Sequence, residues 1–256
     1  MQLADAAAVV TGGASGLGEA TTRALTAKGV SVTILDLQAD RAAALVSELG
    51  GHTSYVMTDV TDGEQVQAAV AEAAGKGREL RVAVNCAGVG WAARVLSRDG
   101  TPHDLDLFAK IIGINLVGTF NVLRLAAAAM AGNQPDEQGE RGAIVNTASI
   151  AAFDGQIGQI AYAASKAGVV GMTLPAARDL SSIGVRVNTI APGIIDTPML
   201  AGLPDDVRAA LAAGVPFPKR LGTPEDYACL AVFLLEHPYL NGETVRMDAA
   251  LRMPPK

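Results

Sequence analysis

The feature that most constrains the fold is an alternation, along the whole chain, of short apolar runs with longer helical stretches. Short apolar runs are typical of strands buried on both faces, and helices between them are the connections that a parallel sheet requires. Because such crossovers are right-handed, the pattern predicts a doubly wound α/β fold of the Rossmann type. Its seven expected strands are Ala6–Thr11, Val32–Leu35, Ser54–Thr58, Val82–Asn85, Ala143–Thr147, Val185–Ile190 and Thr244–Met247.

The stretches between the strands predict helices, and two segments interrupt the rhythm. Gly132–Gly142 is polar and is expected to be a surface loop. Pro192–Arg220 carries five prolines; we expect a lid from about residue 193 to 220, with a short helix at Asp205–Ala213. The longer helices are expected at Gly16–Lys28, Asp40–Leu49, Asp62–Lys76, Leu105–Ala131, Ile160–Leu180 and Pro224–Leu235.

Composition and charge limit the partners. Half of the 256 residues are apolar, enough to fill the core of one domain over residues 1–256, and no internal repeat or linker divides it. The net charge of −6 argues against nucleic acid or an anionic membrane as a main partner. No uninterrupted apolar run reaches the length of about 18 residues that a membrane span needs.

The cysteines and histidines do not suggest a metal centre or a disulfide framework. Cys86 and Cys229 lack CxxC spacing, and the three histidines lack metal-ligand spacing. The first strand begins near Ala6, which leaves no room for a signal peptide. We therefore expect a soluble protein of a reducing compartment without a metal. Alanine-rich helices hint at a bacterial source and favour the cytoplasm.

A glycine-rich turn, Thr11–Gly18 (TGGASGLG), follows the first strand directly. Glycines allow a tight turn there and let backbone amides approach a pyrophosphate, while the next helix offers its N-terminal amides to the same anion. An ordinary turn would also hold glycines, but the place between a strand and a helix predicts a dinucleotide site. The spacing is GxxxGxG rather than GxGxxG. Its candidate residues are Gly12, Ser15, Gly16, Leu17 and Gly18.

Asp36 follows the second strand, eighteen residues after Gly18. A carboxylate at this point hydrogen-bonds the adenosine ribose hydroxyls of NAD and repels the 2′-phosphate of NADP. No lysine or arginine lies in 12–18 or directly after Asp36 to receive that phosphate. We therefore predict NAD rather than NADP, with a helix N-cap as the competing role for Asp36.

Three more segments are candidates for the dinucleotide site. Asp59 and Val60 follow the third strand, where Asp59 either meets the adenine or caps the next helix. Cys86, Ala87 and Gly88 follow the fourth strand and are small enough for a ribose to pass. Asn115 lies in an apolar helical stretch; as a buried amide it must be hydrogen-bonded, either to backbone or within a proton relay.

Ser149, Tyr162 and Lys166 form the candidate catalytic group. Tyr162 and Lys166 are four residues apart and share a helix face, so the ammonium is expected to lower the tyrosine pKa from its usual value of about 10. Ser149 closes the fifth strand, at the sheet edge where α/β folds bind ligands. A serine that holds a substrate oxygen beside a phenol that exchanges its proton is machinery for alcohol–ketone interconversion.

Over nearly its whole length, the chain resembles the short-chain dehydrogenase/reductase family. The resemblance implies that Tyr162 and Lys166 also contact the nicotinamide ribose and that Asn115 supports a water chain. It further implies cofactor contacts from Pro192, Gly193, Ile195 and Thr197. Two residues depart from the family pattern, Cys86 in place of a second asparagine and Ala249 in place of a glycine. The matching pieces are Thr11–Gly18, Asp36, Asp59, Asn85–Gly88, Asn115, Ser149, Tyr162–Lys166 and Ala191–Thr197.

Other stretches are more specific and resemble the type-2 3-hydroxyacyl-CoA dehydrogenases within that family. This resemblance implies an NAD-dependent homotetramer that interconverts 3-hydroxyacyl-CoA and 3-oxoacyl-CoA, with side activity on hydroxysteroids. It also implies that Gln156 contacts the substrate with Ser149 and Tyr162, although from the sequence Gln156 is equally a loop amide. These stretches are Val84–Gly88, Asn146–Gln159, Gly171–Leu180, Pro216–Gly222 and Asn241–Met253.

Several questions stay open at the level of sequence. The pocket walls are expected to be Ala151, Phe153, Ile157 and the lid, which suit acyl chains and steroid rings alike. A 3-oxoacyl-[acyl-carrier-protein] reductase, a steroid or polyol dehydrogenase and a non-catalytic NAD-binding protein are the alternatives; the complete catalytic set argues against the last. Candidates for the coenzyme A phosphates, or else solvated surface residues, are Arg94, Arg98, Lys219 and Arg220.

Overall fold

The computed structural model describes residues 1–198, 200 and 204–255. These residues form a parallel seven-stranded sheet in the order β3-β2-β1-β4-β5-β6-β7, so the predicted fold is confirmed. The chain crosses from one half of the sheet to the other between β3 and β4, which places the carboxyl ends of β1 and β4 side by side. The strands are β1 (Ala7–Thr11), β2 (Ser31–Asp36), β3 (Thr53–Met57), β4 (Leu80–Asn85), β5 (Gly142–Thr147), β6 (Val185–Pro192) and β7 (Thr244–Met247).

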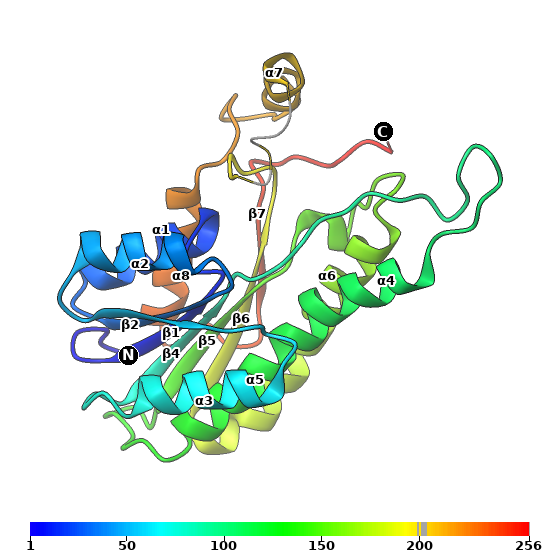
Figure 1. The fold of residues 1–256 in the computed structure, drawn as a ribbon. Helices are drawn as coiled ribbons and strands as arrows, with labels where there is room; N and C mark the ends of the chain where they lie inside the picture. Colours follow the sequence, from blue (N-terminus) through cyan, green and yellow to red (C-terminus); the bar gives the residue numbers. More distant parts are fainter. Residues whose placement is uncertain (199, 201–203, 256) are drawn as a thin grey trace.

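Helices cover both faces of the sheet (Figure 1). One face packs against α1 (Gly16–Ala27), α2 (Ala39–Leu49) and α8 (Pro224–Glu236), and the other against α3 (Gly63–Ala74), α5 (Thr119–Met130) and α6 (Ile160–Asp179). Neighbouring strand residues such as Val9 and Val10 enter opposite cores, because successive side chains of a strand point to opposite faces. The remaining helical segments are α4 (Leu105–Ile112), η1 (Gly113–Gly118), η2 (Ile150–Ala152), η3 (Leu180–Ile183) and α7 (Asp205–Ala213).

The predicted helix Leu105–Ala131 is three segments rather than one. Between α4 and α5 the backbone takes π-helical geometry over Gly113–Gly118, the segment η1. By length and composition, Leu105–Met130 also contains an 18-residue window that is apolar enough to cross a membrane, with a mean hydropathy of 1.6, although polar residues interrupt it. Half of that window is buried in the protein, where α5 packs against β4 and α3 and α4 packs against α6.

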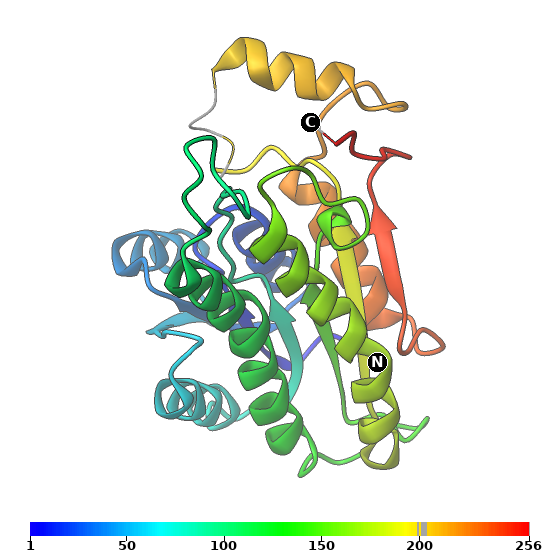
Figure 2. The same ribbon diagram turned by 90° about the vertical axis from the view of Figure 1, so that its right-hand side faces the viewer.

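Strand β6 ends two residues later than the predicted Ile190, and the chain leaves the sheet at about residue 193, where the lid was expected to begin. β6 continues to Pro192, which pairs with Met247 of β7; a proline is tolerated at a strand end because one ladder hydrogen bond is lost there at little cost. The stem is closed where Asp196 N donates to Gly222 O at 2.8 Å. Helix α7 lies where it was predicted, beyond the carboxyl ends of the strands (Figure 2). Residues 199 and 201–203 of the expected lid lie outside the described residues.

Candidate active site

The glycine turn packs backbone against backbone. Gly12 has a φ of 61°, which favours glycine. At Gly18 an added Cβ would stand only 2.1 Å from the carbonyl oxygen of Gly12, so no side chain fits. The turn opens onto the N-terminus of α1, whose N-cap Ser15 forms no side-chain capping bond. The amides at a helix N-terminus fit a pyrophosphate.

Asp36 ends β2 beside this turn and is buried. Its Oδ2 accepts a hydrogen bond from Ala14 N at 3.0 Å, and its Oδ1 accepts one from Gln38 N at 2.9 Å. The N-cap of α2 is Gln38, so the competing role of Asp36 as a helix cap is wrong. Two backbone amides therefore fix the carboxylate at the position expected for adenosine ribose recognition.

The next strand end answers the question left open for Asp59. The N-cap of α3 is Asp62, whose carboxylate accepts from Glu64 N and Gln65 N. Asp59 Oδ1 instead accepts from the backbone and the hydroxyl of Thr61, at 2.9 and 2.7 Å. Val60 is buried, and its Cγ2 would lie 2.6 Å from a Cβ at Gly118. The capping role is thus excluded for Asp59, and contact with adenine stays a prediction.

A buried hydroxyl network that the sequence did not predict lies under the strand ends. The hydroxyls of Tyr227 on α8 and Thr147 on β5 are 2.6 Å apart, and the Cys86 thiol lies 3.6 Å from Tyr227 OH. Thr11 Oγ1 accepts the amides of Cys86 and Ala87. Burial raises the pKa of the Cys86 thiol, which therefore stays protonated. The available signal was a tyrosine at the start of the apolar stretch 227–235 of α8, together with a cysteine where the family usually has asparagine.

Ser149, Tyr162 and Lys166 meet at the carboxyl end of β5. Ser149 lies two residues beyond the strand and caps η2, its Oγ accepting from Ala151 N at 3.1 Å. Tyr162 and Lys166 lie in the first two turns of α6, and Lys166 Nζ is 5.8 Å from the Tyr162 ring centroid. Lys166 Nζ donates to Thr147 O at 2.8 Å, so β5 fixes the position of the ammonium.

The electrostatics of this group differ from the expectation. Burial raises the pKa of Tyr162, and the Ser149 hydroxyl only partly opposes the shift. Burial also lowers the pKa of Lys166 from 10.5 to about 8. The expected lowering of the tyrosine pKa by Lys166 is therefore wrong for the chain by itself, because removal of the phenolate from water is the largest cause of the shift and only the Ser149 hydroxyl opposes it. Close to neutral pH, Tyr162 is a phenol.

Asn115 lies inside η1 and is fully buried. Its Oδ1 accepts from Val89 N at 2.8 Å, and its Nδ2 donates to Val89 O and to Ser165 Oγ at 2.9 and 3.1 Å. Of the two predicted roles, the structure shows hydrogen bonding to the backbone: the Asn115 side chain connects the loop after β4 to α6. Its part in a proton relay stays a prediction.

Gly88 and the start of the lid complete the candidate cofactor groove. A Cβ at Gly88 would lie 3.2 Å from Asn115 Oδ1 and 3.4 Å from Lys166 Nζ, so only a glycine leaves this space open.

Gly193 N donates to Met247 O at 2.9 Å. Thr197 stands 3.5 Å from a Cβ placed on Gly16, which brings the lid against the glycine turn. Ile195 is buried beside Gly222. These positions fit a dinucleotide extended from Asp36 to Lys166.

Several of the residues predicted to contact or surround the substrate are buried or already engaged with other protein groups. Gln156 Nε2 donates to Pro254 O at 3.0 Å, so its amide turns toward the C-terminal segment. Ala151 is buried and therefore does not line an open pocket, whereas Phe153 and Ile157 are exposed. Arg220 pairs with Asp226 at 2.5 Å, so its charge is already engaged.

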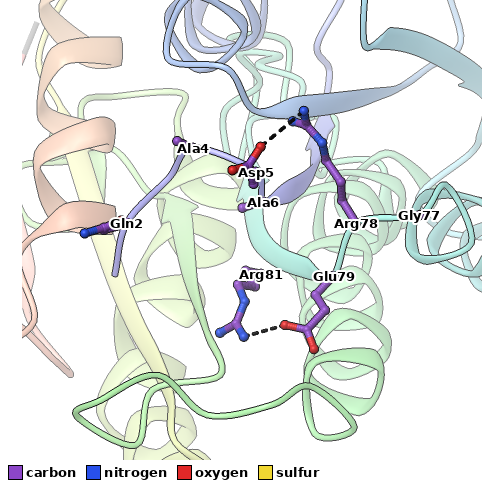
Figure 3. A pocket seen from close by; sticks show the side chains of 8 residues that line it. All are labelled: Gln2, Ala4, Asp5, Ala6, Gly77, Arg78, Glu79 and Arg81. Atoms are coloured by element: carbon purple, nitrogen blue, oxygen red, sulfur yellow. Dashed lines mark hydrogen bonds and ion pairs between the residues drawn. The ribbon is translucent and has the colours of Figure 1, made fainter.

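Of two hollows in the described part of the chain, one lies near this region and the other lies away from it. One, of about 650 Å³, lies between loop 93–96, loop 155–159 and the start of α6, and is mainly apolar; Arg94 is in its lining. The other, of about 530 Å³, lies at the opposite, amino end of β1 and β4 (Figure 3). Its arginines are paired, Arg78 with Asp5 and Arg81 with Glu79, so this second hollow offers no free cation for an anionic ligand. Among the described residues no cluster of three or more His, Cys, Asp or Glu side chains has metal-binding geometry.

Comparison with known proteins decides the family. The family model described as short chain dehydrogenase matches residues 6–208. The chain belongs to the short-chain dehydrogenase family. It is therefore an oxidoreductase, as the sequence predicted.

Short-chain dehydrogenases similar to this chain share nearly its full length. The human 3-hydroxyacyl-CoA dehydrogenase type-2 is 51% identical over 249 residues, covering 97% of this chain and 95% of the relative. The Drosophila melanogaster protein of the same name is 52% identical over 252 residues, covering 98% and 99%. The crystal structure of 3-hydroxyacyl-CoA dehydrogenase type-2 from Mycobacterium avium has a TM-score of 0.95 and 53% identity, covering 98% of this chain and 97% of that chain. The more specific resemblance is thus confirmed.

Proposed function

We propose that this chain is an NAD-dependent dehydrogenase that interconverts 3-hydroxyacyl-CoA and 3-oxoacyl-CoA. The observation that carries the reaction type is the meeting of Ser149, Tyr162 and Lys166 at the carboxyl end of β5. The relatives named 3-hydroxyacyl-CoA dehydrogenase type-2, similar over nearly the whole chain, support the substrate class.

The choice of NAD rests on Asp36. Its buried carboxylate is held by the amides of Ala14 and Gln38 beside the glycine turn, where a 2′-phosphate would meet like charge. When bound, NAD supplies the hydride acceptor. The amides of the turn would hold its pyrophosphate, and Tyr162 and Lys166 its nicotinamide ribose. The proposed contacts also include Asp59, Val60, Cys86, Ala87, Gly88, Pro192, Gly193, Ile195 and Thr197.

The chain's own residues perform the proton transfer. The 3-hydroxyl of the substrate would lie between Ser149 and Tyr162, where the serine hydroxyl orients the oxygen and Tyr162 accepts its proton. Because burial raises the Tyr162 pKa, the phenolate is scarce at neutral pH, and we expect oxidation of the alcohol to speed up as pH rises. The reverse reaction uses the protonated phenol as its acid.

We also propose a homotetramer in the cytoplasm. Apolar side chains are exposed on the outer face formed by η1, α5 and α6 (Val117, Phe120 and Leu174) and on α8 (Phe233). Clusters of exposed apolar side chains are typical of subunit interfaces. Free Cys86 and Cys229 suit a reducing compartment.

The test is NADH formation from (S)-3-hydroxybutyryl-CoA by the wild-type chain and by Tyr162→Phe. We expect turnover with NAD, at least tenfold less with NADP, and a loss of about 10²-fold or more in the variant, since it lacks the acid–base group. Binding of NAD to the variant, measured by calorimetry, is expected to stay within a few-fold.

Matched arms separate the alternatives. A hydroxysteroid with NAD tests the steroid assignment, and 3-oxoacyl-[acyl-carrier-protein] with NADPH tests the reductase. Turnover of only one of these would replace the proposed substrate. Full activity of Tyr162→Phe would show that the proton acceptor is another group.

A further inference from the structure

The C-terminal residues 248–255, called here the tail, contact the loop that follows Ser149. The tail leaves β7 at the end of the sheet where α7 lies, as Figures 1 and 2 show in red. Its partner is loop 153–159, between η2 and α6. This contact lies outside the group of Ser149, Tyr162 and Lys166, and the sequence did not predict it.

Two hydrogen bonds join the loop to the end of the tail. Gln156 Nε2 donates to Pro254 O at 3.0 Å, and Ile157 N donates to Pro255 O, also at 3.0 Å. One bond uses a side chain and the other uses backbone, so together they fix both the position and the orientation of the loop at this point.

Arg246, the third residue of β7, forms a second connection between loop 153–159 and the start of the tail. Its guanidinium donates to Asp154 Oδ2 at 2.6 Å, to Asp248 Oδ2 at 2.8 Å and to Leu251 O at 3.2 Å. It also lies 5.1 Å from the Phe153 ring centroid. Arg246 and Asp154 are each about four-fifths buried, with side-chain exposures of 21% and 19%. A planar, partly desolvated arginine that bridges two carboxylates is a specific connection rather than a surface ion pair.

The loop held in this way is one wall of the apolar hollow of about 650 Å³. Gln156 and Ile157 of this loop line the hollow together with Val95 and Leu96, and Ala163 of α6, next to Tyr162 in sequence, is also in its lining. A shift of the loop would therefore change the width of this hollow, whose lining on α6 includes the residue that follows the candidate proton acceptor.

We propose that Arg246 and the tail are positioning elements that set which acyl chains the enzyme accepts. They act by fixing loop 153–159, and neither acts on the reacting atoms. The identity of the substrate rests on the proposed function, whereas the contact between tail and loop does not.

The experiment compares Arg246→Gln, Arg246→Lys and a chain ending at Arg252 with the wild type. Each is assayed with (S)-3-hydroxybutyryl-CoA and (S)-3-hydroxydecanoyl-CoA, and NAD affinity is measured by calorimetry. We expect the ratio of the two KM values to change at least fivefold in Arg246→Gln and in the shortened chain. We expect kcat and the Kd for NAD to stay within about twofold, and Arg246→Lys to recover part of the change. Arg23→Gln, which breaks a remote pair with Glu19 and Glu48, is the matched control.

Hydrogen exchange at the Ile157 amide gives a readout that needs no substrate. Faster exchange in the shortened chain, with core amides unchanged, supports the proposal. An unchanged KM ratio with an unchanged Ile157 amide overturns it, and so does an equal loss for both substrates and for NAD. If the wild type turns over neither CoA ester, the proposed function fails while the Ile157 amide still decides whether the tail holds the loop.

Discussion

Lys166 is a residue whose ionisation depends strongly on the fold. Its pKa is about 8 in the folded chain, against an ordinary value of 10.5. Between pH 8 and pH 10.5 the Lys166 amine is protonated in the unfolded chain and deprotonated in the folded chain. The free energy of unfolding therefore rises with pH across this range, whereas below pH 8 both states are protonated and this group gives no pH dependence.

We predict that Lys166→Met removes this pH dependence. From pH 7 to pH 10 the free energy of unfolding of the wild type should rise relative to the variant by about 2–3 kcal/mol. Urea unfolding at both pH values measures the difference, with the partly exposed Lys110→Met as control. If the free energy of unfolding changed equally with pH in the wild type, Lys166→Met and Lys110→Met, the pKa shift at Lys166 would be contradicted. Above pH 10 the raised Tyr162 pKa acts in the opposite direction, because the folded phenol keeps a proton that the unfolded chain loses.

Single residues also mark the limit of prediction from sequence. The shared face of Tyr162 and Lys166 followed from their spacing, because two residues four apart on a helix lie one turn from each other. The partner of Gln156 did not, because Pro254 lies 98 positions away in a segment with no periodic pattern. The Tyr162 pKa was mispredicted for a related reason, since burial is a property of the assembled fold.

Helix α8 is the element whose stability is easiest to test. Thr223 accepts from Asp226 N while the Asp226 side chain accepts from Thr223 N, a complete capping box. We predict that Thr223→Ala lowers the free energy of unfolding by about 1 kcal/mol, or a few degrees in Tm, with NAD affinity unchanged. Calorimetry of Thr223→Ala beside Thr223→Ser measures it. An equal loss in Thr223→Ser would show that the methyl group, not the hydroxyl, stabilises the helix end.

The strands and α-helices were predicted to within a few residues, whereas the short helices η2 and η3 and the π-helical segment η1 were not foreseen. Apolar periodicity locates a helix but does not distinguish an α-helical from a π-helical turn, so η1 was not foreseen within Leu105–Ala131. Asn115 lies at this point and bonds both to Val89 and to Ser165 of α6. These are long-range contacts, which a local pattern does not contain.

At the scale of the whole molecule, the testable property is assembly. We predict a mass close to four times 26.1 kDa in light scattering at micromolar concentration. Phe120→Glu should reduce this mass, because it places a charge on the exposed apolar face of α5. Met57→Glu, on the exposed edge strand β3, is the matched control. A monomeric wild type would contradict the tetramer.

The glycine turn sets a limit on how far such a chain can diverge. At Gly18, any side chain would collide with the backbone oxygen of Gly12, 2.1 Å away. A clash with a neighbouring side chain is repaired by a second substitution, but a clash with backbone offers no residue to replace. We therefore expect position 18 to stay glycine whatever substrate the enzyme uses. Helix α7 has no buried residue, so its sequence is free to change. New specificities would be acquired around a turn in which position 18 stays glycine.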